Sequence, residues 1–180
     1  MTFQANDTIY EPGQVRRATY RVESGAVRIF RLLTNGRRQI CSFEYAGDIF
    51  GFEAGSKRAF FAEAMSVTSI LASSGLNPGG SDETPLVLSM ERTQRNLLIL
   101  GYRDPIERVA AFLVDLDARQ GSNGVIELAM PRVDIADHLC LSIETVSRVF
   151  TCLRLKGIIK LLTPRTVMIL RPGALRFIVE

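Results

Sequence analysis

Segment 133–153 constrains the fold of this chain more than any other stretch, and its sequence is VDIADHLCLSIETVSRVFTCL. The spacing of its apolar residues predicts two short helices joined by a tight turn. The second helix carries Glu144, Ser147 and Arg148 at intervals of three and four residues, which puts them on one face. A carboxylate, a hydroxyl and a guanidinium are costly together in a core and suited to a polar surface. The segment therefore predicts a helix-turn-helix.

The chemistry of this polar face favours DNA. In the major groove, Arg can donate two hydrogen bonds to guanine, Glu can accept one from cytosine, and Ser can contact either edge. We therefore expect base contacts from Glu144, Ser147 and Arg148. Charged residues also occur on ordinary helix surfaces, so the combination rather than any one residue carries the prediction. Contacts to the DNA backbone are expected from further polar residues of the same region, namely Arg132, Ser142, Thr145, Lys156 and Arg165.

The charge of the chain is unevenly distributed. The whole chain has a net charge of +3. Residues 131–180 hold eight Lys and Arg against four acids, whereas residues 1–130 hold 14 against 15. The basic excess therefore coincides with the two-helix segment, as expected when Lys and Arg contact phosphates.

The composition excludes several classes of protein. An apolar fraction of 47% allows packed cores and is too high for a disordered chain. No apolar run approaches the roughly 20 residues of a membrane-spanning helix, and residues 1–10 lack the features of a signal peptide. Three cysteines, an odd number, argue against a disulfide framework and fit a reducing cytoplasm.

The first 75 residues contain short apolar alternations separated by turn residues. Segment 26–33 alternates apolar and basic positions, Asn35-Gly36 is a strong hairpin signal, and segment 39–45 supplies the returning strand. Turns at intervals of about 8 to 12 residues indicate a sandwich or a barrel. Further strands are predicted at 7–13, 19–23 and 62–71, and a Gly/Ser/Pro-rich loop at 73–81.

An apolar repeat after this loop predicts a long helix with a dimer seam. Its steps alternate between four and three residues, as in a coiled coil. The repeat consists of Leu86, Met90, Thr93, Leu97 and Leu100. It covers barely two heptads, so the alternative is a single amphipathic helix that lies on its own domain.

The remaining segments lie before and after the two-helix segment. Asp104-Pro105 predicts the start of a helix that runs to residue 119, because Asp is a good N-cap and Pro suits a first turn. A short strand is expected at 125–128. Segments 158–162 and 166–170 predict a β-hairpin wing, with Gly157 ending the second helix of the pair.

In this order, the segments resemble the CRP–FNR superfamily of bacterial transcription regulators along nearly the whole chain. The resemblance is carried by ESGAVRIFRLLTNGRRQICSFEYAGDIFG at 23–51 and ERVAAFLVDLDAR at 107–119. It is most specific at MPRVDIADHLCLSIETVSRVFTCLRLKGII, residues 130–159, where Glu144, Ser147 and Arg148 are similar to the FNR-type triad. The most similar subgroup is the FixK branch, linked to low-oxygen gene control in rhizobia.

The resemblance implies an α+β fold in three parts. These are a small jelly-roll β-barrel like a cyclic-nucleotide-binding domain (1–82), a long dimerisation helix (83–103) and a winged helix-turn-helix (104–180). It also implies a homodimer that binds double-stranded DNA at a TTGA-containing palindrome and activates transcription through RNA polymerase. The same mode of DNA binding would serve a repressor, so that alternative stays open.

The resemblance fails at the cyclic-nucleotide site. Members that bind cyclic nucleotides have Phe-Gly-Glu followed by Arg-Ser or Arg-Thr. Here Glu53 is displaced by one position, and Ala59 follows Arg58. We therefore expect no cyclic nucleotide to bind and interpret Arg58 as a solvated loop residue. A cyclic-nucleotide-responsive regulator of the same fold is the alternative.

No cofactor, metal or catalytic site is predicted. An iron–sulfur cluster of the kind some members carry needs about four thiolates, whereas Cys41, Cys140 and Cys152 are three scattered cysteines. His138 is the only histidine and is interpreted as part of the polar face of the first helix of the pair. The sequence has no nucleophile–base pair and no phosphate-cradling loop, so we do not expect an enzyme.

Cys140 is unusual for its position, because the resemblance implies Gly in this turn. A thiol just before a helix N-terminus, in a basic setting, favours the reactive thiolate. Oxidation would add an acidic or bulky group near DNA phosphates, so we hypothesise that Cys140 makes DNA binding sensitive to oxidation. The alternative is a small residue tolerated in a turn. Cys152 is interpreted as a packing residue.

Overall fold

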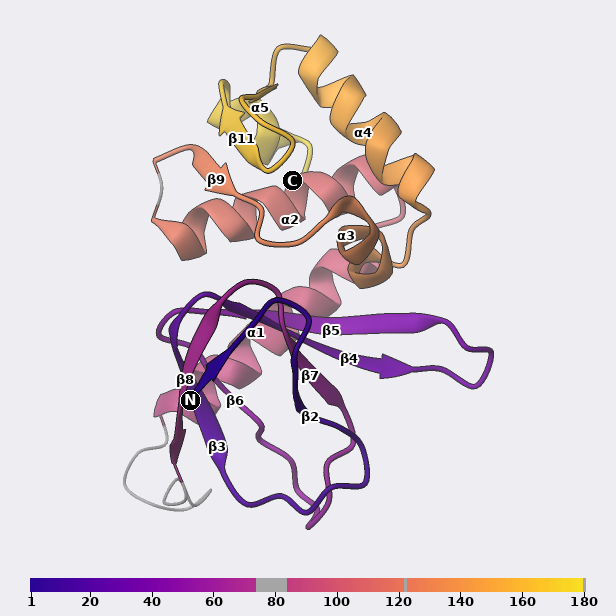
Figure 1. Ribbon diagram of the computed structural model, residues 1–180. Coiled ribbons are helices and arrows are strands. Elements are labelled where there is room, and N and C mark those ends of the chain that lie inside the picture. The colour runs from indigo at the N-terminus through magenta and orange to yellow at the C-terminus, as the bar shows by residue number, and fades with distance from the viewer. Residues whose placement is uncertain (74–83, 122, 180) are drawn as a thin grey trace. The chain divides into compact units, whose positions relative to one another are not determined.

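The computed structural model describes residues 1–73, 84–121 and 123–179 (Figure 1). They belong to two compact units, Met1–Arg95 and Asn96–Glu180, and helix α1 (Thr84–Gly101) contributes residues to both. Most of the predicted loop at 73–81 lies outside the described residues.

The first unit contains two antiparallel four-stranded sheets. One has the order β1-β8-β3-β6 and the other β2-β7-β4-β5, so each sheet pairs strands that are distant in sequence. This is the predicted β-barrel of jelly-roll type. The strands are β1 (Thr2–Phe3), β2 (Thr8–Tyr10), β3 (Thr19–Ser24), β4 (Ala26–Leu32), β5 (Arg38–Tyr45), β6 (Ile49–Phe50), β7 (Phe61–Ala64) and β8 (Thr68–Ser73).

The β4–β5 hairpin forms where Asn35-Gly36 predicts it. Gly36 has a φ of 78°, and the backbone N–H of Leu33 donates to the Arg37 carbonyl over 2.8 Å. The Asn35 side chain accepts from the Arg37 N–H at 3.0 Å. The hairpin extends well beyond the other strands of its sheet (Figure 1).

The single strand predicted at 62–71 is wrong, because the chain turns between β7 and β8. The backbone N–H of Met65 donates to the Ala26 carbonyl at 2.8 Å, and Val67 is left exposed. The Thr68 hydroxyl donates to the same Ala26 carbonyl at 3.1 Å. Apolar alternation continues through this turn and therefore conceals it.

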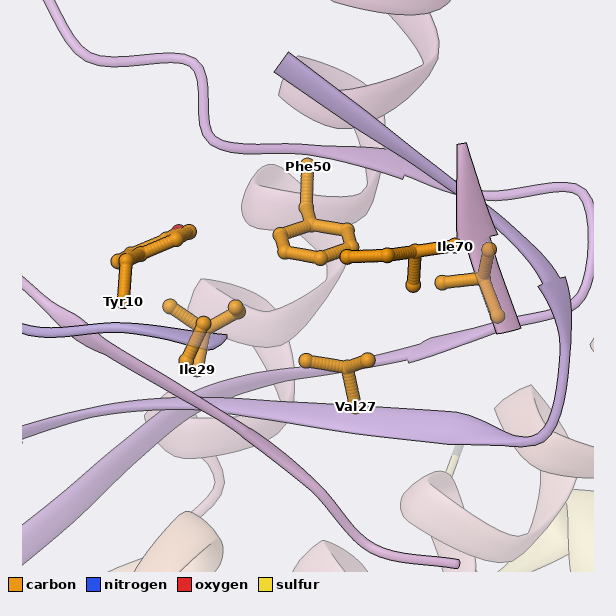
Figure 2. Close-up of a cluster of buried hydrophobic side chains, with 7 residues drawn as sticks. Tyr10, Val27, Ile29, Phe50 and Ile70 are labelled. Carbon is orange, nitrogen blue, oxygen red and sulfur yellow. The ribbon is translucent and has the colours of Figure 1, made fainter. Parts of the chain in front are cut away.

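The core of the barrel is aromatic and aliphatic. Side chains from both sheets point toward one another, as Figure 2 shows for Tyr10, Val27, Ile29, Phe50 and Ile70. All five are at most 8% exposed. Their burial removes apolar surface from water and is the main source of the unit's stability.

The second unit has the predicted winged helix-turn-helix arrangement. Helix α2 (Pro105–Gln120) begins at Asp104, whose side chain accepts from the Ile106 N–H at 3.1 Å, and Glu107 completes a capping box. Antiparallel strands form a sheet of order β10-β11-β9. The other elements are β9 (Val125–Glu127), α3 (Arg132–Leu139), α4 (Ile143–Leu155), β10 (Ile159–Leu161), β11 (Thr166–Ile169) and α5 (Pro172–Phe177).

Candidate nucleic-acid interface

Helix α4 has one buried and one exposed face. Its buried residues recur at steps of three and four and are Val146, Val149, Phe150 and Leu153. Glu144, Ser147 and Arg148 lie on the opposite face, and all three are exposed. The arrangement follows from the helical period, because apolar positions packed on one side leave these polar positions to solvent. The sequence-predicted trio is therefore brought together on one accessible surface.

The turn between α3 and α4 is tight and hydrogen-bonded. Cys140 adopts the left-handed conformation, with φ 55° and ψ 43°. The next backbone N–H, that of Leu141, reaches back to the Ala136 carbonyl at 3.0 Å. Such a turn normally holds Gly, since a side chain in the left-handed region is strained. Cys140 is exposed in this turn, two residues before Ser142 at the N-cap of α4.

Polar contacts order the start of the exposed face. The Ser142 hydroxyl caps α4 by accepting from the Thr145 N–H at 3.2 Å. The Thr145 hydroxyl lies 3.1 Å from the Ser142 hydroxyl and accepts from the Arg148 guanidinium at 3.1 Å. Hydrogen bonds from its own backbone N–H and from Ser142 lower the pKa of Glu144, which keeps the carboxylate ionised as an acceptor.

Arg132 packs instead of extending outward. Its guanidinium carbon lies 3.4 Å from the centre of the Phe150 ring, and its Nη1 is buried without a hydrogen-bond partner. Burial lowers the pKa of Arg132 to about 10. The structure thus puts this guanidinium in a contact between α3 and α4, an arrangement that the sequence pattern did not indicate.

The interpretation of His138 as a surface residue is wrong. It is 3% exposed, and its ring centre lies 5.7 Å from that of Phe112 on α2. Helix α3 packs on α4 and also contacts α2 through His138 and the Leu139 carbonyl, so its polar positions are not all solvated. Cys152 is half-buried on α4, in keeping with its interpretation as a packing residue.

Two further basic residues lie at the end of α4 and in the wing. Lys156 is exposed and caps α4, so the cap lies one residue before the predicted Gly157. Arg165 is exposed in the turn between β10 and β11, where its backbone N–H donates to the Thr163 hydroxyl at 3.1 Å. Both side chains are accessible to a phosphate.

Helix α1 exposes apolar side chains along the predicted seam. Leu86, Met90, Thr93 and Leu97 are exposed, and Leu100 is half-buried. Leu97 has 64% of its surface accessible. A different side of the helix packs on the barrel, where the Arg92 guanidinium lies 3.0 Å from Asp48 and 3.3 Å from Glu44. Four of the five seam positions are thus exposed among the residues that the structure describes.

The barrel holds a pocket of about 320 Å³ lined by Tyr10, Gln14, Val15, Arg17, Tyr20 and Arg58. The interpretation of Arg58 as a solvated loop residue is wrong, because it is 3% exposed. Its two terminal nitrogens donate to the carbonyls of Gly51 (2.9 Å) and Ala18 (2.5 Å). Its guanidinium also lies 4.1 Å from the Tyr10 ring centre. Sequence alone did not indicate this aromatic stacking.

A cyclic nucleotide fits these residues poorly. In binding members, an Arg and the adjacent Ser or Thr hold the cyclic phosphate. Here two of the five N–H groups of Arg58 donate to backbone carbonyls, and Ala59 offers no hydroxyl. The Ala59 N–H itself donates to the Glu53 carboxylate at 2.9 Å. A cyclic phosphate would therefore lack the hydroxyl that binding members supply and would compete with Glu53 for the Ala59 N–H.

Residues 1–73, 84–121 and 123–179 contain no cluster of three or more His, Cys, Asp or Glu side chains able to hold a metal ion. In the same ranges, no helix combines the length and apolar character needed to cross a membrane.

Comparison with known proteins identifies the family. Residues 1–74 match the cyclic nucleotide-binding domain model, and residues 107–178 match the Crp-like helix-turn-helix domain model. The nitrogen fixation regulation protein FixK of Rhizobium meliloti is 46% identical, with 97% of this chain and 84% of that protein covered. The chain belongs to the FixK branch of the CRP–FNR superfamily.

Other FixK proteins are also similar. The FixK of Azorhizobium caulinodans is 41% identical over 97% of this chain and 76% of its own length. The solved structure of FixK2 from Bradyrhizobium japonicum has a TM-score of 0.90 and 31% identity, covering 100% of this chain and 96% of that chain. The α+β fold and the membership of a family of transcription regulators are thereby established.

Proposed function

We propose that this chain is a sequence-specific DNA-binding regulator that acts as a homodimer on a TTGA-type palindrome. The observation that carries this is the exposed face of α4 with Glu144, Ser147 and Arg148. Arg148 would donate to guanine, Glu144 would accept from a cytosine amino group, and Ser147 would reach a base edge or a backbone oxygen. Ser142, Thr145, Lys156 and Arg165 are nearby candidates for contacts to the DNA backbone.

Dimerisation through α1 would supply the two-fold symmetry that a palindrome requires. The seam residues Leu86, Met90 and Leu97 are 40%, 57% and 64% exposed, and their burial against a second copy would remove apolar surface from water. Two recognition helices related by a two-fold axis would enter successive major grooves about 34 Å apart.

The barrel supports regulation without a small-molecule effector. Arg58 is bonded to Gly51 and Ala18 and stacked on Tyr10, and Glu53 occupies the Ala59 N–H. A ligand phosphate would compete with these contacts and would find no hydroxyl at Ala59. The alternative is a cyclic-nucleotide-responsive regulator of the same fold, and calorimetry with cyclic AMP and cyclic GMP separates the two.

Cys140 is the proposed point of control by oxidation. Its side chain is exposed in the turn that leads to Ser142 and the reading face of α4. A sulfinate there would repel the phosphates that the helix must approach. Cys41 is also exposed, on a barrel strand, and desolvation raises the pKa of its thiol, which disfavours the reactive thiolate.

The relatives suggest the process that is controlled. The two relatives described above are named nitrogen fixation regulation protein FixK, so this chain would control genes of nitrogen fixation. It would do so as a cytoplasmic protein. We propose activation through RNA polymerase, and a reporter fused to a palindromic promoter distinguishes an activator from a repressor by the sign of its response.

A gel shift on duplexes of different spacing tests the proposal. The protein is titrated against TTGA-N6-TCAA and against the same half-sites separated by eleven base pairs. The added five base pairs turn one half-site by about half a helical turn, so a dimer should lose about tenfold or more in affinity. Equal affinity for both spacings would contradict binding as a symmetric dimer, and sedimentation of the free protein reports its oligomeric state.

A further inference from the structure

A line of hydrogen bonds runs along the first turns of α4. Its members, Ser142, Thr145 and Arg148, are spaced three residues apart and so lie on one side of the helix. The Arg148 Nη2 donates to the Thr145 Oγ1 at 3.1 Å, and the two hydroxyl oxygens of Thr145 and Ser142 are 3.1 Å apart. Thr145 is half-buried beside the two exposed side chains.

The protons of this line have a consistent order. Thr145 Oγ1 accepts from the guanidinium, so its own hydroxyl proton is available for Ser142. Ser142 Oγ also accepts from the Thr145 N–H at 3.2 Å, which ties the line to the backbone at the N-cap of α4. The Arg148 guanidinium is thus held by a hydroxyl that contacts a second hydroxyl, and hydrogen bonds in a chain polarise one another.

We propose that Thr145 is a positioning residue that holds Arg148 for base reading. This rests on the proposed function, in which Arg148 and Glu144 contact bases. A free Arg side chain loses much rotamer entropy when it binds. A guanidinium already held at one nitrogen loses less, and its remaining N–H groups stay available for guanine.

This role differs from the contact to the DNA backbone that the sequence predicts for Thr145. A hydroxyl bonded to phosphate contributes affinity for any DNA sequence and does so whether or not Arg148 is present. A hydroxyl that positions Arg148 contributes only through Arg148 and only on DNA that carries the guanine. The two roles therefore separate in a double-mutant cycle.

The experiment measures dissociation constants of the full chain by fluorescence anisotropy. The proteins are wild type, Thr145→Val, Arg148→Ala and the double variant. The duplexes are TTGA-N6-TCAA and TTAA-N6-TTAA, in which the guanine is replaced in both half-sites. Val has nearly the shape of Thr without the hydroxyl, and Thr145→Ser is the matched control that retains it.

We expect Thr145→Val to reduce the preference for the guanine-containing duplex about fivefold, the scale of one net hydrogen bond. Thr145→Ser should restore most of that preference. Adding Thr145→Val to Arg148→Ala should change neither dissociation constant. Thermal unfolding of each variant verifies that the second unit remains folded.

Two outcomes would overturn the positioning role. One is that Thr145→Val loses affinity equally on both duplexes, or loses it equally with and without Arg148, which would assign Thr145 to the DNA backbone. The other is that Thr145→Ser loses as much preference for the guanine-containing duplex as Thr145→Val does. If instead Arg148→Ala prefers the guanine duplex as wild type does, the proposed base reading itself fails, and this result is distinct from the other two.

Discussion

The guanidinium of Arg132 is stacked on the ring of Phe150, with 3.4 Å between its central carbon and the ring centre. The contact joins α3 to the recognition helix α4. Because the folded state lowers the pKa of Arg132 to about 10, the charge is a cost to folding at neutral pH. That cost is present below pH of about 10 and is relieved as the pH rises toward the ordinary value of the group. Packing of the flat guanidinium against the ring offsets it.

Substitution of Arg132 should therefore affect stability according to shape rather than charge. We expect Arg132→Ala to lose about 1 kcal/mol of unfolding free energy, a typical value for a substitution that removes side-chain packing. Arg132→Met should lose less, because its thioether can pack on the ring and leaves no buried N–H unsatisfied. Urea unfolding measures both. If Arg132 only packs, the salt dependence of DNA binding should be the same in Arg132→Met as in wild type. If Arg132 contacts phosphate, the slope of the logarithm of the binding constant against the logarithm of the salt concentration should fall by about one per protomer.

Arg92 should contribute more to stability than its neighbour Arg95. Arg92 bridges Glu44 and Asp48 of the barrel, and its removal leaves two shielded carboxylates without their cation. Because Arg92 contacts two shielded carboxylates, we expect Arg92→Ala to cost about 1–3 kcal/mol of unfolding free energy. The ion pair of Arg95 is with Glu91 on the exposed side of the helix, at 3.8 Å, so Arg95→Ala should cost about 0.5 kcal/mol or less. Equal losses of unfolding free energy in the two variants, measured by chemical denaturation, would refute a specific role for Arg92.

Leu97 and Leu98 provide a matched test of the seam. They are similarly exposed, at 64% and 71%, but lie about 100° apart around α1. We expect Leu97→Glu to weaken self-association by about tenfold or more, since it puts two carboxylates into an apolar interface. Leu98→Glu should have a much smaller effect. Analytical ultracentrifugation measures the monomer–dimer equilibrium, and a stronger effect of Leu98→Glu would exclude the predicted seam.

Cys140 should be replaceable by Gly with a gain in stability. Its φ of 55° lies in the left-handed region, where removal of the side chain relieves about 1 kcal/mol. We expect Cys140→Gly to raise the unfolding free energy by that amount, whereas Cys140→Ala, which keeps the Cβ, should give no comparable gain. Thermal unfolding of the two variants provides the measurement, and equal stability would mean that the turn holds no such strain.

The same variant tests control by oxidation. Mild peroxide should weaken DNA binding of wild type about tenfold, because one added negative charge close to phosphate costs on the order of 1 kcal/mol or more. Cys140→Gly should bind DNA equally before and after treatment, and Cys152→Ser should behave as wild type. If peroxide lowers the DNA affinity of Cys140→Gly as much as that of wild type, Cys140 is not the sensitive residue.

The parts of the structure that depend on local periodicity could be predicted from the sequence. The exposed trio on α4 follows from steps of three and four residues, and the Asn35-Gly36 turn from its own residues. Arg58 and Arg132 could not be located this way, because their partners Tyr10 and Phe150 are brought to them by the fold. The link from Thr145 to Arg148 was missed although the spacing of 142, 145 and 148 could have indicated it.

Base reading by Arg148 is tested most directly by its effect on sequence preference. Dissociation constants of wild type and Arg148→Ala are measured at one salt concentration on TTGA-N6-TCAA and on TTAA-N6-TTAA. We predict that wild type prefers the first duplex and that Arg148→Ala loses roughly 1–3 kcal/mol per half-site on it, binding both duplexes alike. An Arg148→Ala protein that keeps the wild-type preference would contradict the reading of DNA by this face of α4.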